Sequence, residues 1–234
     1  MEMSSSGKAT AVLVHGAWAD GSSWRRVIRL LLEKGIDVVA VQNPTTSLGD
    51  DVAATHQVID AIKGPVVLVG HSWGGTVITE AGNRPNVRAL VYVAAFAPDV
   101  GHSTGDQVAA HDTPPGLSGV TDIGNGKLMM SVESWISNVA QDLPESEARL
   151  LAAVQTPLGL PTFNDKVTQT AWSDRPTFYV VSGEDRAVSV ELQRQLAARM
   201  KAKTTELQTS HMSLLSAPAA VAEVIYAAVM EVSA

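Results

Sequence analysis

The fold of this chain of 234 residues depends on one stretch, Val66-Val67-Leu68-Val69-Gly70-His71-Ser72-Trp73-Gly74-Gly75. Its first residues are apolar and predict a buried strand, after which Gly70, Ser72 and Gly74 follow at the spacing G-x-S-x-G. A sharp turn from strand to helix needs glycines beside the serine, because larger side chains collide with the neighbouring strand and helix. Such a turn raises the serine hydroxyl clear of the sheet. The order of strand, turn and helix therefore predicts a nucleophilic Ser72 and disfavours the alternative, an ordinary N-cap serine.

On both sides of this stretch, strand-like apolar runs alternate with segments of helical periodicity. This alternation predicts an α/β fold for residues 1–234: one domain whose six-stranded, mainly parallel sheet is flanked by helices on both faces. The predicted strands are Thr10–Val14, Ile36–Val41, Pro65–Val69, Arg88–Ala94, Pro176–Val181 and Thr204–Gln208. Helices are predicted over residues 24–32, 50–62, 72–82 and 189–200, and after Pro218.

Residues 97–172 break the alternation. They hold much of the glycine and proline of the chain, together with short helical stretches near Val132–Gln141 and Glu145–Val154. A long irregular insertion in a compact domain is usually functional or disordered. Its apolar residues argue against disorder, so we expect a lid inserted over a site.

A serine hydroxyl needs a base to accept its proton. In a site of this kind the chain order is serine, acid, histidine, each in a loop after a strand. His211 alone among the histidines follows the last predicted strand, and Asp185 follows the penultimate one. Glu184 is the immediate rival for the acid, and Asp99, after the fourth strand, is a more distant one.

The negative charge that develops on the substrate oxygen needs backbone N–H donors. Trp73 follows the nucleophile at the start of a helix and is predicted to supply one donor. Ala17, in the loop after the first strand, is predicted to supply the other, with Gly16 allowing the chain to turn. His15 is interpreted as structural, and the side chain of His71 as packed beneath the turn.

Composition excludes several classes of function. The chain has no cysteine, which excludes disulfides, a thiol nucleophile and thiolate metal sites. The formal net charge is −7 and no run of Lys and Arg exceeds two, so nucleic acid is not an expected partner. The N-terminal segment Met1–Ala9 is polar, and no segment reaches the ~20 apolar residues of a membrane span. A cytoplasmic location without membrane association is therefore expected.

Together these motifs resemble the α/β-hydrolase superfamily, in the branch of small bacterial esterases, plant methylesterases and salicylate-binding proteins, and plant hydroxynitrile lyases. The resemblance spans nearly the whole chain and rests on residues 12–18, 70–75, 92–98, 183–188 and 210–211. It implies that the Asp before Arg-x-Val, Asp185, is the acid, and that the residue after His-Gly, Ala17, donates to the oxyanion. It also implies that no metal or organic cofactor is used.

Two positions separate this chain from the lyases of that branch. Those enzymes carry Thr where this chain has Gly16, and Lys where it has Met212, so the resemblance favours an esterase acting on a small-molecule ester through an acyl-enzyme on Ser72. The oligomeric state is left open, as are two alternatives: a lyase or C–C hydrolase on the same scaffold, and a non-enzymatic ligand-binding protein. Four aromatic side chains are candidates for an apolar or aryl pocket, although core packing is an equal alternative for the second and third: Trp18, Trp135, Phe163 and Trp172.

Overall fold

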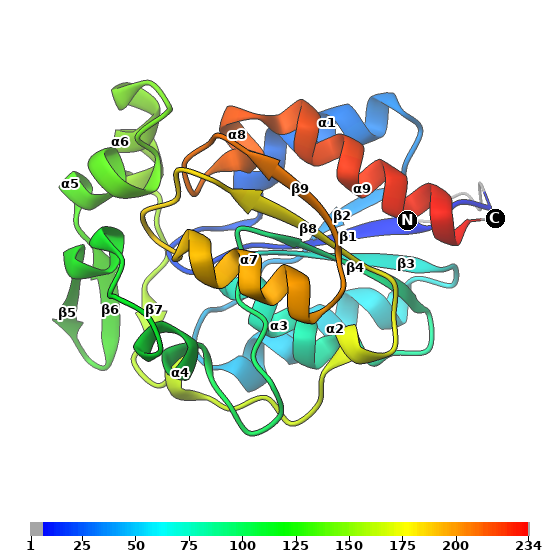
Figure 1. The fold of residues 1–234 in the computed structure, drawn as a ribbon, viewed down its shortest axis with the longest axis horizontal. Coiled ribbons are helices and arrows are strands. Elements are labelled where there is room, and N and C mark those ends of the chain that lie inside the picture. The colour runs from blue at the N-terminus through cyan, green and yellow to red at the C-terminus, as the bar shows by residue number, and fades with distance from the viewer. Residues whose placement is uncertain (1–6, 234) are drawn as a thin grey trace.

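The centre of the molecule is a parallel sheet of six strands in the order β2-β1-β3-β4-β8-β9 (Figure 1). The computed structural model describes residues 7–233. The central strands are buried on both faces, as near-continuous runs of valine and leucine predict. The predicted parallel sheet is confirmed, with these strands: β1 (Thr10–Val14), β2 (Val38–Ala40), β3 (Val66–His71), β4 (Val87–Val93), β8 (Thr177–Ser182) and β9 (Lys203–Leu207).

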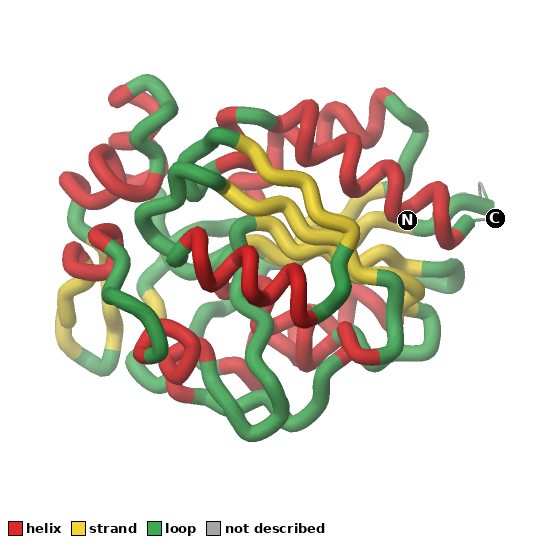
Figure 2. Tube along the Cα trace, viewed as in Figure 1, coloured by secondary structure: helices red, strands yellow, loops and turns green. Residues whose placement is uncertain are grey.

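Helices cover both faces of the sheet (Figures 1 and 2). Successive residues of a strand point to opposite faces. Val67 and Val69 therefore join the core beneath α1 and α9, and Val66 and Leu68 join the core beneath α2, α3 and α7. The helices are α1 (Arg25–Glu33), α2 (Leu48–Ala61), α3 (Trp73–Ala81), α7 (Val190–Arg199), α8 (Ser213–Ser216) and α9 (Pro218–Val232).

The strand order reverses between β1 and β3. The chain runs outward from β1 to β2 and then returns, so that β3 pairs with the other side of β1. In open parallel sheets, ligands bind beyond the carboxyl ends of the strands at such a reversal. The loop after β1 and the turn after β3 meet at that place.

A second, antiparallel sheet lies in the inserted segment, which is defined here as residues 97–172. The two helical stretches expected from the sequence are present, but the small sheet of order β5-β6-β7 is not among the sequence predictions. The segment contains α4 (Thr104–Ala109), β5 (Val120–Gly124), β6 (Lys127–Met130), α5 (Val132–Ser134), a wide helical turn (Trp135–Val139), α6 (Glu145–Ala153) and β7 (Leu158–Gly159).

Hydrogen bonds tie the inserted segment to loops at the carboxyl ends of the main strands. The indole Nε1 of Trp18 donates to the carbonyl of Leu128 at 3.1 Å. The backbone N–H of Ser210 donates to Asp142 Oδ2 at 2.8 Å. In Figure 1 the arrowheads of β8 and β9 point toward the side of the molecule that carries α5 and α6. The inserted segment therefore lies at the edge of the sheet where the strand order reverses.

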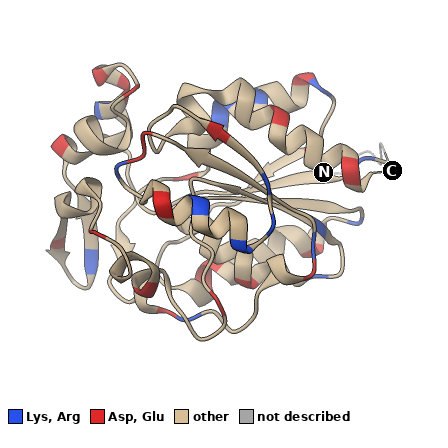
Figure 3. Ribbon diagram, viewed as in Figure 1, with Lys and Arg blue, Asp and Glu red and all other residues tan. Residues whose placement is uncertain are grey.

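Within the described residues, no helix combines the length and the apolar character needed to cross a membrane. The positions of acidic and basic residues are interspersed along the helices (Figure 3). Most of the polar segment Met1–Ala9 lies outside the described residues.

Candidate active site

Ser72 lies in the turn between β3 and α3, with φ 54° and ψ −122°. A residue with a side chain rarely adopts this region, and the surrounding structure must hold it there. The backbone N–H of Ser72 donates to the carbonyl of Val93 at 3.2 Å, and its own carbonyl accepts from Gly75 N at 2.9 Å. A Cβ at Gly74 would lie 2.5 Å from the carbonyl oxygen of Val14. The glycine thus lets α3 pack directly on β1 and places the serine at the reversal.

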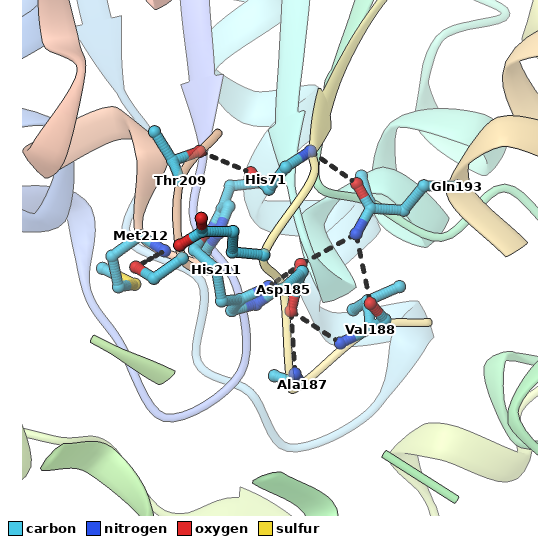
Figure 4. Close-up of polar contacts among 12 residues, drawn as sticks. His71, Asp185, Ala187, Val188, Gln193, Thr209, His211 and Met212 are labelled. Atoms are coloured by element: carbon cyan, nitrogen blue, oxygen red, sulfur yellow. Dashed lines mark hydrogen bonds and ion pairs between the residues drawn. The ribbon is translucent and has the colours of Figure 1, made fainter. Parts of the chain in front are cut away.

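His211 and Asp185 form a hydrogen-bonded pair (Figure 4). The Nδ1 atom of His211, in the loop after β9, lies 2.7 Å from Oδ2 of Asp185, in the loop after β8. A carboxylate only accepts, so Nδ1 carries the proton, and Nε2 of the neutral ring keeps a lone pair. Both side chains are buried, with 5% of His211 and 8% of Asp185 exposed. This is the tautomer that a general base for a serine hydroxyl requires.

The Asp185 carboxylate accepts from further N–H groups on both of its oxygens. The backbone N–H groups of Ala187 and Val188 donate to Oδ1 at 2.7 and 2.9 Å. The side chain of Gln193, on α7, donates from Nε2 to Oδ2 at 2.8 Å, and its Oε1 accepts from the backbone N of Ser182 (Figure 4). These contacts leave the carboxylate little freedom to rotate. The sequence alone does not predict this role of Gln193.

The two rival acids lie elsewhere. The side chain of Glu184 is exposed to solvent. Asp99 forms an ion pair with Arg199, at the end of α7, rather than with a histidine. Among the candidates, Asp185 is therefore the carboxylate that the structure places on His211.

Two further histidines pack next to the site and form hydrogen bonds to its backbone. The Nε2–H of His71 donates to the backbone carbonyl of His211 at 2.9 Å, and the two ring centroids are 4.6 Å apart. Burial holds the pKa of His71 well below its usual range, so the ring is neutral. His15 accepts from the backbone N of Asn43 at 3.0 Å through Nε2, and its Nδ1–H donates to the carbonyl of Gly16 at 2.8 Å. Both rings are buried, as expected of structural histidines.

Two backbone N–H groups next to Ser72 are available as donors. Ala17 lies in the loop after β1 and Trp73 is the first residue of α3; no described residue accepts a hydrogen bond from either N–H. A Cβ at Gly16 would lie 2.9 Å from Ser72 Cβ, so this glycine lets the loop come close to the serine. Free N–H groups at a helix start also carry the positive end of the helix dipole. An oxyanion hole requires backbone N–H donors of this kind.

Ser72 and His211 line one narrow pocket that is partly open to solvent. Apart from histidine, no residue of its lining is ionisable, and most are apolar. Within residues 7–233, no group of three or more His, Asp or Glu side chains is placed to hold a metal ion. Three of the predicted aromatic residues belong to the lining: Trp18, Trp135 and Phe163.

Trp172, the fourth aromatic candidate, is not part of that lining. Its ring lies against the guanidinium of Arg199, with 5.1 Å between the ring centroid and Cζ. The structure therefore does not place Trp172 beside Ser72 in this pocket, and a cation on α7 lies over its ring instead.

Comparison with known proteins identifies the family of the chain. Residues 11–224 match the model of the alpha/beta hydrolase family. A carbendazim-hydrolysing esterase of Nocardioides sp. is 36% identical over a stretch that covers 41% of this chain and 45% of that protein. An alpha-hydroxynitrile lyase of Arabidopsis thaliana is 24% identical, over 88% of this chain and 92% of that protein.

Among solved structures, polyneuridine aldehyde esterase superposes with a TM-score of 0.81 at 21% identity. The superposition covers 94% of this chain and 98% of that one. At this identity the similarity supports the same fold and nothing further.

Proposed function

The chain belongs to the alpha/beta hydrolase family and is an enzyme of the carboxylesterase type, and we propose that it cleaves small apolar or aryl esters through an acyl-enzyme on Ser72. The observation that carries the proposal is the His211–Asp185 pair, with Nδ1 and Oδ2 2.7 Å apart. It leaves a basic Nε2 on a ring that lines the same pocket as the serine.

The first half of the reaction forms the acyl-enzyme. Ser72 Oγ attacks the ester carbonyl while His211 Nε2 takes the hydroxyl proton, and the imidazolium is stabilised by Asp185. The carbonyl oxygen becomes an oxyanion and accepts from the backbone N–H groups of Ala17 and Trp73. The intermediate then collapses: the bond from carbon to the alkoxy oxygen breaks, and His211 returns the proton to the departing alcohol.

The second half clears the acyl-enzyme by the same route. Water gives a proton to His211 Nε2 and attacks the acyl carbon. The oxyanion of the second tetrahedral intermediate again accepts hydrogen bonds from the two N–H donors. Its collapse returns the proton to Ser72 Oγ and releases the carboxylic acid. No metal or organic cofactor enters either step.

The apolar lining supports the choice of substrate. An ester with charged groups would lose its hydration in this pocket without gaining an ionic partner, which is costly. The inserted segment contributes Trp135 and Phe163 to the wall, and we assign it the role of a lid that shapes the pocket.

A lyase is the second candidate, because a hydroxynitrile lyase is among the relatives. Met212 lines the pocket and is uncharged, and no lysine lines the pocket to stabilise a departing cyanide ion. One preparation, assayed with a p-nitrophenyl ester and with mandelonitrile between pH 5 and 9, separates the two. Ester hydrolysis with negligible cyanide release supports the esterase. Cyanide release faster than ester turnover would replace the esterase with the lyase.

A further inference from the structure

Asp51 is a carboxylate in the first turn of α2 with no exposed surface. Within the described residues it forms no ion pair. Burial raises its pKa to about 6, although the N–H groups that it binds act in the opposite direction. A buried carboxylate without a cation weakens the fold, which calls for a reason elsewhere in the molecule.

Each oxygen of this carboxylate accepts one N–H. Oδ2 accepts from the indole Nε1 of Trp73 at 2.7 Å. Oδ1 accepts from the backbone N of Thr45, in the loop after β2, also at 2.7 Å. Because both oxygens are occupied, an amide at this position satisfies only one of the two donors.

The first contact reaches the proposed oxyanion hole. Trp73 follows Ser72 directly, and its backbone N–H is one of the two free donors. Its ring is fully buried and lies against Phe163, with 5.7 Å between centroids, and Phe163 lines the pocket. Asp51 thus fixes the side chain of the residue whose backbone faces the developing charge.

The second contact reaches the inserted segment. Thr45 has φ 54°, and its carbonyl accepts from the backbone N of Gly159 in β7 at 2.7 Å. Its hydroxyl donates to the carbonyl of Pro157 at 3.0 Å. The carboxylate therefore holds the loop on which the last strand of the inserted segment rests.

We propose that Asp51 is a positioning residue that couples the oxyanion donor Trp73 to the anchor of the lid. This rests on the proposed esterase function. The coupling acts on the charge that forms in the transition state, so its loss lowers kcat more than it raises KM.

The test is a double-mutant cycle of Asp51→Asn and Trp73→Phe, with Asp50→Asn as the matched control. Asp50 is the neighbouring, exposed carboxylate of the same helical turn. Removing an oxyanion donor outright costs ~10²–10³ in kcat, and displacing one should cost less. We expect each single variant to lose ~10–100-fold in kcat with KM changed less than about threefold, and Asp50→Asn to retain its kcat. The double variant should lose no more than the worse single one, because both substitutions disrupt the same network through which Asp51 holds Trp73.

Several results would overturn the proposal. The first is a kcat of Asp51→Asn equal to that of the wild type, and the second is an effect of Asp51→Asn on KM alone. The third is a loss of kcat in the double variant equal to the product of the two single losses. If Asp51→Asn does not fold by circular dichroism, Trp73→Phe carries the test alone: it keeps the backbone N–H and must still lose kcat. Failure of the esterase function itself would show separately, as wild-type protein that does not hydrolyse the ester.

Discussion

The turn between β3 and α3 that carries Ser72, called the elbow below, meets the inserted segment at one pocket. The two regions are built in opposite ways. The elbow is buried and held by backbone bonds and close contacts of glycine, with Ser72 forced to φ 54°. The inserted segment places β5 largely in solvent and adds single side chains such as Trp135 to the pocket wall. We call the six-stranded sheet, the elbow and the loops of Asp185 and His211 the framework. Under the proposed function, the framework carries the chemistry and the inserted segment carries the choice of substrate. Substitutions in the two regions should therefore affect different kinetic constants.

The largest effect is expected at the elbow. Ser72→Ala removes the nucleophile and should cost on the order of 10⁴–10⁶ in kcat, with the fold intact by circular dichroism. Turnover of a p-nitrophenyl ester measures it. Near-normal turnover would show that Ser72 is not the nucleophile.

The next effect concerns the acid. Asp185→Asn no longer enforces the tautomer of His211 and should lower kcat by ~10⁴ near neutral pH. Glu184→Gln and Asp99→Asn are the matched controls and should cost far less, since neither side chain binds His211. The comparison of the three rates identifies the acid, and a larger loss in either control would reassign it.

A smaller effect is expected at the junction of the two regions, in stability rather than in rate. The pKa of Asp51 is raised from 3.8 to about 6 on folding, so wild-type protein loses stability as pH rises through this range and levels off above it. The loss is about 3 kcal/mol at 1.36 kcal/mol per pKa unit. Asp51→Asn lacks this titration, so its free energy of unfolding relative to wild type should rise by about 2.4 kcal/mol between pH 4 and 7.5, because the unfolded carboxyl is already partly ionised at pH 4.

Urea denaturation of both proteins at the two pH values measures this difference. Asp50→Asn serves as the control, because its carboxylate is exposed and its pKa is lowered rather than raised. A difference between Asp51→Asn and wild type that stays constant with pH would mean that Asp51 does not titrate in this range.

The smallest effect is expected in the inserted segment. Trp135→Ala opens the pocket wall and should lower kcat/KM for aryl esters by about tenfold, mostly through KM. Val132→Ala, on an exposed side chain of the same segment, should change neither constant. Kinetics with an aryl and a short alkyl ester measure the selectivity, and an equal loss of kcat on both would place Trp135 in the chemistry.

The framework was predictable because its signals are local. Buried runs of valine and leucine mark the strands, and glycine spacing marks the elbow. The hairpin of β5 and β6 also has a local signal, Gly124-Asn125-Gly126, since asparagine followed by glycine is typical of a tight hairpin turn. The structure places all three residues at positive φ. The composition of the surrounding segment, rich in glycine and proline, obscured this signal.

Contacts between distant residues were not predictable in the same way. Asp51 in the first turn of a helix is typical of an acid that favours the helix dipole, and nothing near it in sequence points to Trp73. Gln193 lies on a helix of mixed polarity, and its role depends on how α7 packs over Asp185. The contact of Trp172 with Arg199 is likewise not predictable from the sequence, because the two residues are distant along the chain.

The central claim is that the framework holds one activated serine. Incubation with an organophosphonate ester, followed by intact mass and peptide mapping, tests it directly. The account predicts one stoichiometric adduct on Ser72 in the wild-type protein and none in Ser72→Ala. An unmodified wild-type protein across the pH range, or an adduct at another residue, would contradict it.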